Sequence, residues 1–336
     1  MSDRGGSSND DASKTPPSGS APRTVAVLGG TGLIGSSICR AFLDSGRTVV
    51  AFARHDVDPH RAPLLDGATI VLGDANDAPT LKGVLDGVDH VVDALGAPHP
   101  ALSARKPLAQ FDAELPVLLS LLELVAARRG IGFTYLSSGG AIYGDVDDLP
   151  VNEDAECRPV SPYGVTKLTA ERYVLMAARR SGVQVQVLRV ANAIGPTQLA
   201  GTGQGVIAAL LHGAETGCAV RLFGDGSSVR DYVDVADVAA ASVALSVLNP
   251  PGLVVNVGSG VGYRLDAVVA LVEDVTGASI RIDRAPARPT DVRAITLDVD
   301  RLRGLMSWHP TPLRRSVEAA WAQWRAWREE ERSGAT

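Results

Sequence analysis

The chain has 336 residues, of which 45% are hydrophobic and 21% charged, and its formal net charge is -6. This length and apolar content suffice for one large α/β unit or two smaller ones. Acidic and basic residues are mixed along the chain, which argues against a nucleic-acid or membrane surface. No apolar run approaches the roughly 18–20 residues needed to cross a bilayer. We therefore expect a globular protein with no nucleic-acid or membrane partner.

The cysteines and the N-terminal segment indicate the compartment. Cys39, Cys157 and Cys218 are far apart, odd in number and without metal-like spacing. They are interpreted as reduced thiols in a cytoplasmic protein, and no metal site is expected. Residues 1–22 are rich in Ser, Gly, Asp and Pro and have no apolar segment, so we expect a disordered tail and no secretory signal.

The first structured segment is typical of a dinucleotide-binding start. The β-branched run 24–28 predicts a buried parallel strand, and an amphipathic helix is expected to end near residue 45. Glycines between them permit a tight turn and place phosphates at the helix N-terminus, although an ordinary glycine-rich loop is the alternative. The candidate cofactor-binding residues of this turn are Gly29, Thr31, Gly32, Leu33, Ile34 and Gly35.

The end of the second strand bears on the choice of cofactor. Strand 48–53 is followed by Arg54, and no acid appears before Asp56. An acid at this point normally binds the adenosine ribose of NAD, whereas an arginine fork suits a ribose 2′-phosphate. The sequence therefore favours NADP(H), with NAD possible. A solvated loop arginine is the alternative interpretation.

The next two strands supply further cofactor candidates. Residues 68–72 predict the third strand, after which Asp74 and Ala75 are placed to meet the adenine. An acid that caps the following helix would give the same pattern. Residues 88–96 predict the fourth strand, which ends in Ala94, Leu95 and Gly96, where a cofactor would lie close.

The following segment carries a candidate catalytic pair. Tyr163 and Lys167 are four residues apart and therefore share one face of the expected helix. An ammonium one turn from a phenol stabilises the phenolate, so the tyrosine ionises closer to neutral pH. Such a tyrosine can exchange a proton with a sugar or alcohol oxygen while hydride moves on the same carbon. By itself this spacing is common by chance, and its weight depends on the segments around it.

Strands alternate with helices at a spacing that predicts an α/β fold with a Rossmann-type doubly wound parallel sheet. A smaller α/β substrate-binding domain is expected after it, with the C-terminal tryptophans serving mainly in packing. The expected division is a tail at 1–22, a cofactor domain at 23–190 completed by about 231–258, and a substrate domain at 191–230 and 259–332. The expected elements are helices at about 109–129, 205–215, 235–247, 264–275 and from 312, and strands at 133–138, 185–190 and 253–257.

These segments together, over residues 23–328, resemble the extended short-chain dehydrogenases/reductases. The nucleotide-sugar epimerase/dehydratase group, typified by UDP-glucose 4-epimerase, is the closest in pattern. The resemblance rests on the glycine turn, the pair Tyr163 and Lys167, and the segments 137–145, 224–232 and 288–291.

The resemblance implies a role for each candidate. Tyr163 would be the acid/base, and Lys167 would bind the nicotinamide ribose. Arg230 and Arg288 would neutralise the diphosphate of a sugar nucleotide, since guanidinium forks bind phosphate well, although each could be a surface ion pair. Asp291 would take the ribose hydroxyls. The remaining substrate-binding candidates are Asn192, Gln204, Val206, Leu222 and Phe223.

Two positions depart from the family pattern. The family usually has Ser or Thr where this chain has Gly139, and the nearest hydroxyl is Ser138, a candidate catalytic residue. Where the family often has Asn facing the cofactor, this chain reads 112–116, Asp-Ala-Glu-Leu-Pro.

Three functions are compatible with these residues. The favoured one is an NADPH-dependent NDP-4-keto-6-deoxyhexose 4-ketoreductase acting on a dTDP- or UDP-sugar. The first alternative is an NAD-dependent 4-epimerase of the UDP-glucose 4-epimerase type. The second is a non-catalytic NADP-binding sensor, for which the missing hydroxyl at Gly139 is the motive. The resemblance also implies a homodimer.

Overall fold

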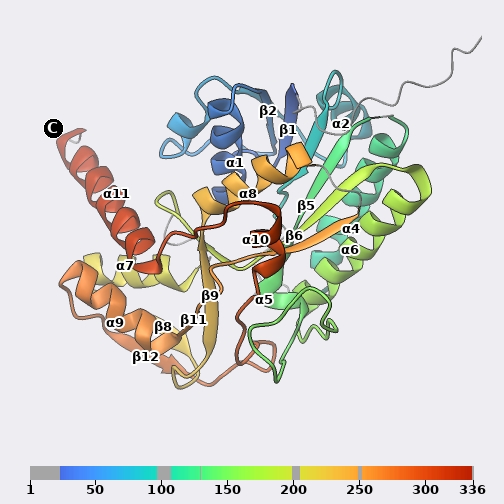
Figure 1. Ribbon diagram of the computed structural model, residues 1–336. Coiled ribbons are helices and arrows are strands. Elements are labelled where there is room, and N and C mark those ends of the chain that lie inside the picture. The colour runs from blue at the N-terminus through green and yellow to red at the C-terminus, as the bar shows by residue number, and fades with distance from the viewer. Residues whose placement is uncertain (1–22, 97–106, 129, 199–204, 249–251, 335–336) are drawn as a thin grey trace, which may run out of the picture.

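The computed structural model describes residues 23–96, 107–128, 130–198, 205–248 and 252–334 (Figure 1). The expected tail at 1–22 and the candidate Gln204 lie outside the described residues.

A seven-stranded sheet, parallel throughout, forms the centre of the larger part of the molecule. Its strand order is β10-β6-β5-β4-β1-β2-β3, so the predicted doubly wound parallel sheet is confirmed. Its strands are β1 (Thr24–Leu28), β2 (Thr48–Ala53), β3 (Thr69–Leu72), β4 (His90–Asp93), β5 (Gly132–Ser138), β6 (Gln184–Val190) and β10 (Leu253–Val257).

Helices cover both faces of this sheet (Figure 1). Alternate residues of β1 show the two cores, because Val25 and Val27 pack with one set of helices while Ala26 and Leu28 pack with the other. Burial on both faces explains why the strand reads as a continuous apolar run. The first set is α1 (Leu33–Asp44) and α8 (Val235–Leu248), and the second is α2 (Ala78–Val84), α4 (Pro107–Ala126) and α6 (Pro162–Ser181).

A smaller α/β part follows, with its own apolar core. Strand β9 (Val229–Asp234) lies between β7 (Asn192–Ile194) and β11 (Gly262–Arg264), and β8 (Val220–Phe223) pairs with β12 (Ile282–Ala285). These short strands, the 3-10 turn η1 (Ala62–Leu65), and the helices α5 (Gly139–Ile142) and α10 (Asp300–Leu305) were not anticipated. The helices that complete this part are α7 (Val206–Thr216), α9 (Leu265–Thr276) and α11 (Leu313–Gly334).

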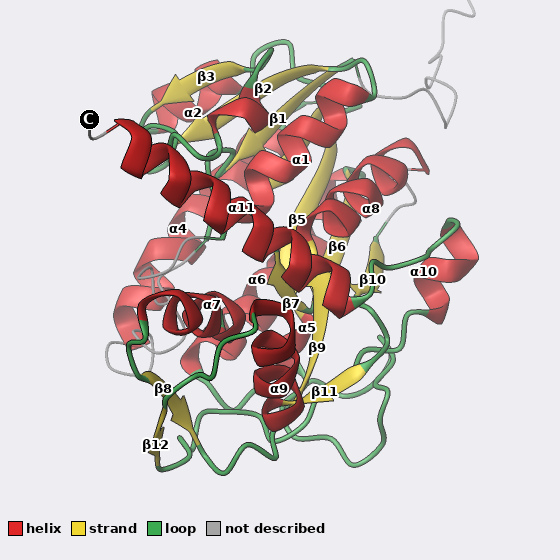
Figure 2. Cartoon of the chain, turned by 90° about the vertical axis from the view of Figure 1, so that its left-hand side faces the viewer, coloured by secondary structure: helices red, strands yellow, loops and turns green. Residues whose placement is uncertain are grey.

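The two parts are connected by α11, which runs from the small part towards β2 (Figure 2). The Trp324 indole donates to the backbone carbonyl of Gln198, and the Trp327 ring stacks on His60 with centroids 4.0 Å apart. From the same segment as His60, the Arg61 guanidinium donates to the carbonyl of Thr197 at 3.1 Å. The loop after β2 is therefore held by residues from distant parts of the chain.

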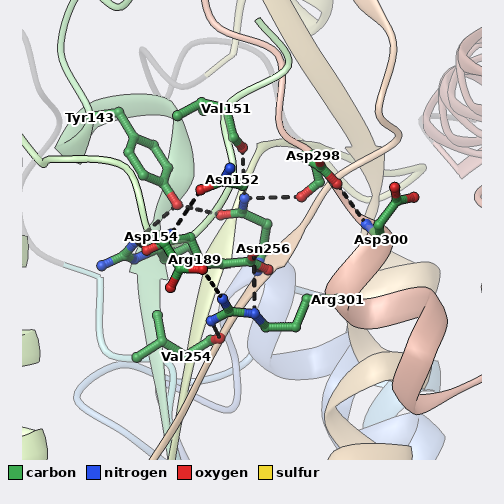
Figure 3. A network of polar contacts seen from close by, with 11 residues as sticks. Tyr143, Val151, Asn152, Asp154, Arg189, Val254, Asn256, Asp298, Asp300 and Arg301 are labelled. Atoms are coloured by element: carbon green, nitrogen blue, oxygen red, sulfur yellow. Dashed lines mark hydrogen bonds and ion pairs between the residues drawn. The ribbon is translucent and has the colours of Figure 1, made fainter. Parts of the chain in front are cut away.

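A buried polar network links β6 and the edge strand β10 to the loops that carry Val151 and Asp298 (Figure 3). The Tyr143 hydroxyl donates to Asn256 Oδ1 at 2.7 Å and accepts from Arg189 at 2.9 Å. The Asn256 amide in turn donates to the carbonyls of Val151 and Asp298, both at 3.0 Å. Each of these buried polar groups thus has a partner, as low-polarity surroundings require.

Within the described ranges, no helix combines the length and the hydropathy that crossing a membrane demands.

Candidate functional site

The turn between β1 and α1 depends on its glycines. Gly29 has φ +77, and a Cβ there would lie 2.5 Å from the carbonyl oxygen of Ala94. A Cβ on Gly35 would meet the backbone of Gly29, and Gly32 is the N-cap of α1. The backbone can therefore approach a phosphate closely at the start of a twelve-residue helix. These residues fit the pyrophosphate of a dinucleotide.

The ends of the neighbouring strands bring the other cofactor candidates to the same edge of the sheet. Arg54 follows β2 and is exposed, and Asp74 follows β3 and is also exposed. Hydrogen bonds from Asn76 lower the pKa of Asp74, and the nearby Arg54 charge acts in the same direction. Ala75 is buried in the core, whereas Ala94 and Leu95 are half-buried and Gly96 is exposed after β4.

Helix α6 carries Tyr163 and Lys167. Its start is well defined, because the Ser161 side chain accepts a hydrogen bond from the Gly164 amide and Pro162 occupies the first turn. Tyr163 is half-buried, Lys167 is buried, and the ammonium lies 6.0 Å from the centroid of the Tyr163 ring. The structure thus brings the predicted pair together.

The Lys167 ammonium is not a free charge. Its Nζ lies 2.8 Å from Glu114 Oε1 and donates to the carbonyl of Leu136 at 3.1 Å. The same Glu114 oxygen accepts from the Tyr135 hydroxyl at 2.5 Å, and the other oxygen accepts from Gln110 at 3.1 Å. Sequence analysis noted the segment 112–116 as a departure but did not assign Glu114 a role.

Burial determines the electrostatics of this cluster. Burial opposes the charge on Lys167, but the nearby Glu114 and Tyr163 outweigh it, so the pKa of Lys167 is raised. Burial raises the pKa of Asp93 to about 6, although Lys167 acts against this shift. A small cavity of about 20 Å³ adjoins the two carboxylates, which is room for about one water. Its lining residues are Asp93, Leu95, Gly96, Ala113, Glu114, Val117 and Leu118.

The end of β5 has no room for a side chain at Gly139. A Cβ on Gly139 would lie 2.6 Å from Leu297 Cδ1 and 2.9 Å from the carbonyl oxygen of Arg189. Ser138 is half-buried, and its side chain makes no cap hydrogen bond. The hydroxyl of Ser137 is buried and has no hydrogen-bond partner in the described part of the chain. Ser137 was not among the residues expected at the site, although the Ser137-Ser138 doublet in the sequence was the available signal.

The arginines of the smaller part form a cationic group. The Arg288 guanidinium lies 4.1 Å from the Phe223 ring centroid, and its Nε lies 2.9 Å from Asp291 Oδ2. Arg230 donates to the carbonyls of Val229 and Arg293, and within the described ranges no carboxylate lies at ion-pair distance from it. Burial lowers the pKa of Arg230, which indicates a partly desolvated cation suited to an anion.

The other substrate candidates lie in different surroundings. The Asn192 amide donates to the carbonyl of Asp231 at 2.8 Å and thereby ties β7 to β9. Leu222 is buried in the core of the smaller part, so only its backbone can face a ligand. Val206 is the half-buried first residue of α7.

Comparison with known proteins identifies the family. Residues 25–258 match the NAD dependent epimerase/dehydratase family. The chain belongs to this family. The extended short-chain dehydrogenase/reductase resemblance is therefore confirmed, and the protein is an enzyme of the epimerase/dehydratase family.

Three similar proteins illustrate the relationship. The UDP-glucose 4-epimerase of Azospirillum brasilense is 32% identical over 85% of this chain and 87% of its own. The structure of the Thermotoga maritima UDP-glucose 4-epimerase with UDP-glucose matches with a TM-score of 0.84 and 28% identity, over 90% of this chain and 99% of that one. The Thermus thermophilus UDP-glucose 4-epimerase in complex with NAD matches over the same shares, with a TM-score of 0.82 and 28% identity.

Proposed function

We propose that this enzyme is an NAD-dependent nucleotide-sugar 4-epimerase of the UDP-glucose 4-epimerase type. The observation that carries the proposal is the similarity to UDP-glucose 4-epimerases, which extends across both the cofactor half and the substrate half. It favours the epimerase over the 4-ketoreductase that the sequence first suggested. Accordingly a UDP-sugar is preferred to a dTDP-sugar as substrate.

The surroundings of Arg54 support NAD in place of NADP(H). Arg54 was the sole motive for NADP(H), but the Asp74 carboxylate lies near enough to interact with it. A carboxylate there offsets the guanidinium charge and opposes a ribose phosphate. The NAD in the Thermus thermophilus complex agrees with this choice. We therefore expect NAD⁺ to bind more tightly than NADP⁺.

In this proposal, Tyr163 performs the proton transfers. As a phenolate, Tyr163 takes the proton of the sugar C4 hydroxyl, and as a phenol it later returns that proton to the C4 oxygen of the turned sugar. The bound nicotinamide supplies the hydride acceptor and donor. Lys167 provides positive charge 6.0 Å from the Tyr163 ring. Arg230 and Arg288 hold the diphosphate, so the sugar can turn over while the nucleotide stays bound.

The hydroxyl that assists Tyr163 has to come from a residue other than Gly139. Ser138 is the sequence-based candidate, and its side chain is partly accessible. Ser137 is the second candidate, since its buried hydroxyl has no protein partner in the described ranges. Ser138→Ala and Ser137→Ala separate the two, because the assisting serine is the one whose loss lowers kcat with little change in folding.

The decisive experiment incubates the purified enzyme with UDP-glucose and follows UDP-galactose by chromatography. Redox-neutral interconversion without net change in NADH supports the epimerase. Stoichiometric consumption of NADPH with a 4-keto sugar would instead establish the reductase. Binding of cofactor and UDP-sugars without turnover of a UDP- and dTDP-sugar panel would establish a sensor.

The homodimer is a further part of the proposal. Helices α4 and α6 pack together and expose a set of apolar side chains, which a second copy could cover. Light scattering should give a dimer mass, and Phe111→Glu with Val165→Glu should give the monomer. Leu248→Glu, an exposed position on α8, is the control. The exposed side chains are Leu108, Phe111, Leu119, Val165, Tyr173 and Met176.

A further inference from the structure

The Glu114–Lys167 contact is enclosed by protein on every side that the structure describes. The side chains of Lys167 and Glu114 are only 5% and 6% exposed, and their charged atoms are 2.8 Å apart. Tyr135 and Gln110 donate to the two oxygens of Glu114, so the carboxylate has a fixed orientation. A carboxylate held in this way directs Lys167 towards the end of β5, beside Tyr163.

The ionisable groups around Lys167, besides Tyr163 on the same helix, come from three elements. They are Asp93 from β4, Glu114 from α4 and the Tyr135 hydroxyl from β5. Burial raises the pKa of Asp93 to about 6, so above that pH Asp93 adds a negative charge beside the Glu114–Lys167 pair. An ammonium alone favours the phenolate of a nearby tyrosine, whereas a carboxylate beside it opposes that effect.

We propose that Glu114 is a positioning residue that holds Lys167 and sets the pH range over which Tyr163 exchanges its proton. Tyr163 is thereby kept protonated to a higher pH than a lone lysine would allow. The ionisation of Tyr163 can be measured whatever the reaction is; only the effect on turnover rests on the proposed function.

The test uses Glu114→Gln, which keeps the shape and removes the charge. The Oε1 of Gln110 has no partner in the described part of the chain, so its amide can turn to accept from the new side chain. The ionisation of Tyr163 is isolated as the difference in near-ultraviolet tyrosinate absorbance between each protein and its Tyr163→Phe counterpart, since the chain has six tyrosines. We expect the Tyr163 midpoint to fall by about one pH unit in Glu114→Gln.

Three further variants make the result decisive. Glu123→Gln, an exposed position on α4, should leave the midpoint unchanged, and Glu114→Asp should keep it near that of the unaltered enzyme. Asp93→Asn should lower it, which provides a second test if Glu114→Gln does not fold. A midpoint in Glu114→Gln that is unchanged or higher overturns the proposal.

Because Tyr163 must be ionised to take the proton of the C4 hydroxyl, the acid limb of kcat for UDP-glucose epimerisation should move in the same direction as the titration. A shifted titration in a protein that lacks epimerase activity would refute the proposed function and retain the role of Glu114. Epimerase activity together with an unshifted Tyr163 titration in Glu114→Gln would support the proposed function and refute the role of Glu114.

Discussion

The carboxylate of Glu171 and the guanidinium of Arg189 form a buried ion pair that fastens the Tyr163 helix to β6. Arg189 Nη2 lies 2.8 Å from Glu171 Oε2, and Arg189 Nε lies 3.1 Å from Glu171 Oε1. Glu171 is one further turn along α6 from Lys167, on the same face of the helix. The pair therefore fixes the rotation of the helix that presents Tyr163.

Removal of the Glu171 charge should destabilise the fold. We expect Glu171→Gln to lower the free energy of unfolding by about 3–5 kcal/mol, because it leaves a buried guanidinium without its counter-ion. Urea denaturation measures the change. Glu156→Gln is the matched control, since Glu156 pairs with Arg158 on the surface, where solvent screens the charges, and its loss should leave stability nearly unchanged. Equal effects of the two substitutions would contradict the argument.

Tyr163→Phe should lower turnover by about 10²–10⁴-fold while NAD binding stays close to normal, because only the acid/base group is lost. Turnover is measured by sugar interconversion and binding by calorimetry. Tyr173→Phe, on the exposed side of the same helix, is the control and should leave both unchanged. Unimpaired turnover in Tyr163→Phe would remove this residue from the mechanism.

Gly139→Ser should be destabilising, since the added Cβ would approach Leu297 and the carbonyl of Arg189. Overpacking of this kind reduces stability by about 1–3 kcal/mol. Leu297→Ala makes space on one side of residue 139. The double variant should therefore lose less stability than the sum of the losses in the two single variants. Thermal denaturation of the four proteins provides the comparison, and strict additivity would show that Leu297 does not fill the position.

Asp93 should make stability depend on pH. Its pKa rises from 3.8 to about 6 on folding, chiefly through burial, so the folded chain keeps a proton that the unfolded chain has lost. Its favourable contribution is present below pH 3.8 and disappears as pH rises through about 6. Asp93→Asn should therefore stabilise the protein by roughly 1–3 kcal/mol at about pH 8 and have little effect near pH 4. Urea denaturation at the two pH values tests this, and a gain of equal size at both would exclude Asp93 as its source.

Arg230→Gln should weaken UDP binding about 10–100-fold, because a charge-assisted hydrogen bond contributes about 1.5–3 kcal/mol. Calorimetry with UDP measures the affinity. Arg221→Gln, an exposed position on β8 in the same smaller part, should change the affinity by less than about threefold. Similar losses in both variants would point to general electrostatic attraction rather than to a site at Arg230.

The sequence predicted the elements with strong patterns. The apolar run before Gly29 and the Tyr163 helix were anticipated because a buried parallel strand and a capped helix each have a local signature. Strands β7, β8, β11 and β12 have only three or four residues each, too few for a periodic pattern. Their pairing is decided by tertiary contacts.

Site residues could be predicted from the sequence where residue type and spacing alone indicate the role. Tyr163 and Lys167 belong to this class, and the structure brings them together. Glu114 does not, because its effect arises from contacts that α4 makes with α6 and β5. Arg54 was interpreted as an NADP(H) ligand from its position after β2 alone. The Asp74 carboxylate that interacts with it follows a different strand, so the sequence did not reveal their proximity.

The stack of Trp327 on His60 also bears on how the chain matures during synthesis. His60 belongs to the loop after β2, yet the ring that covers it lies on α11 and is translated long after it. The amino-terminal half can begin to fold as it emerges. The loop that carries His60 nevertheless acquires this covering only after α11 has been synthesised, so the loop should become fully ordered later than the strands beside it.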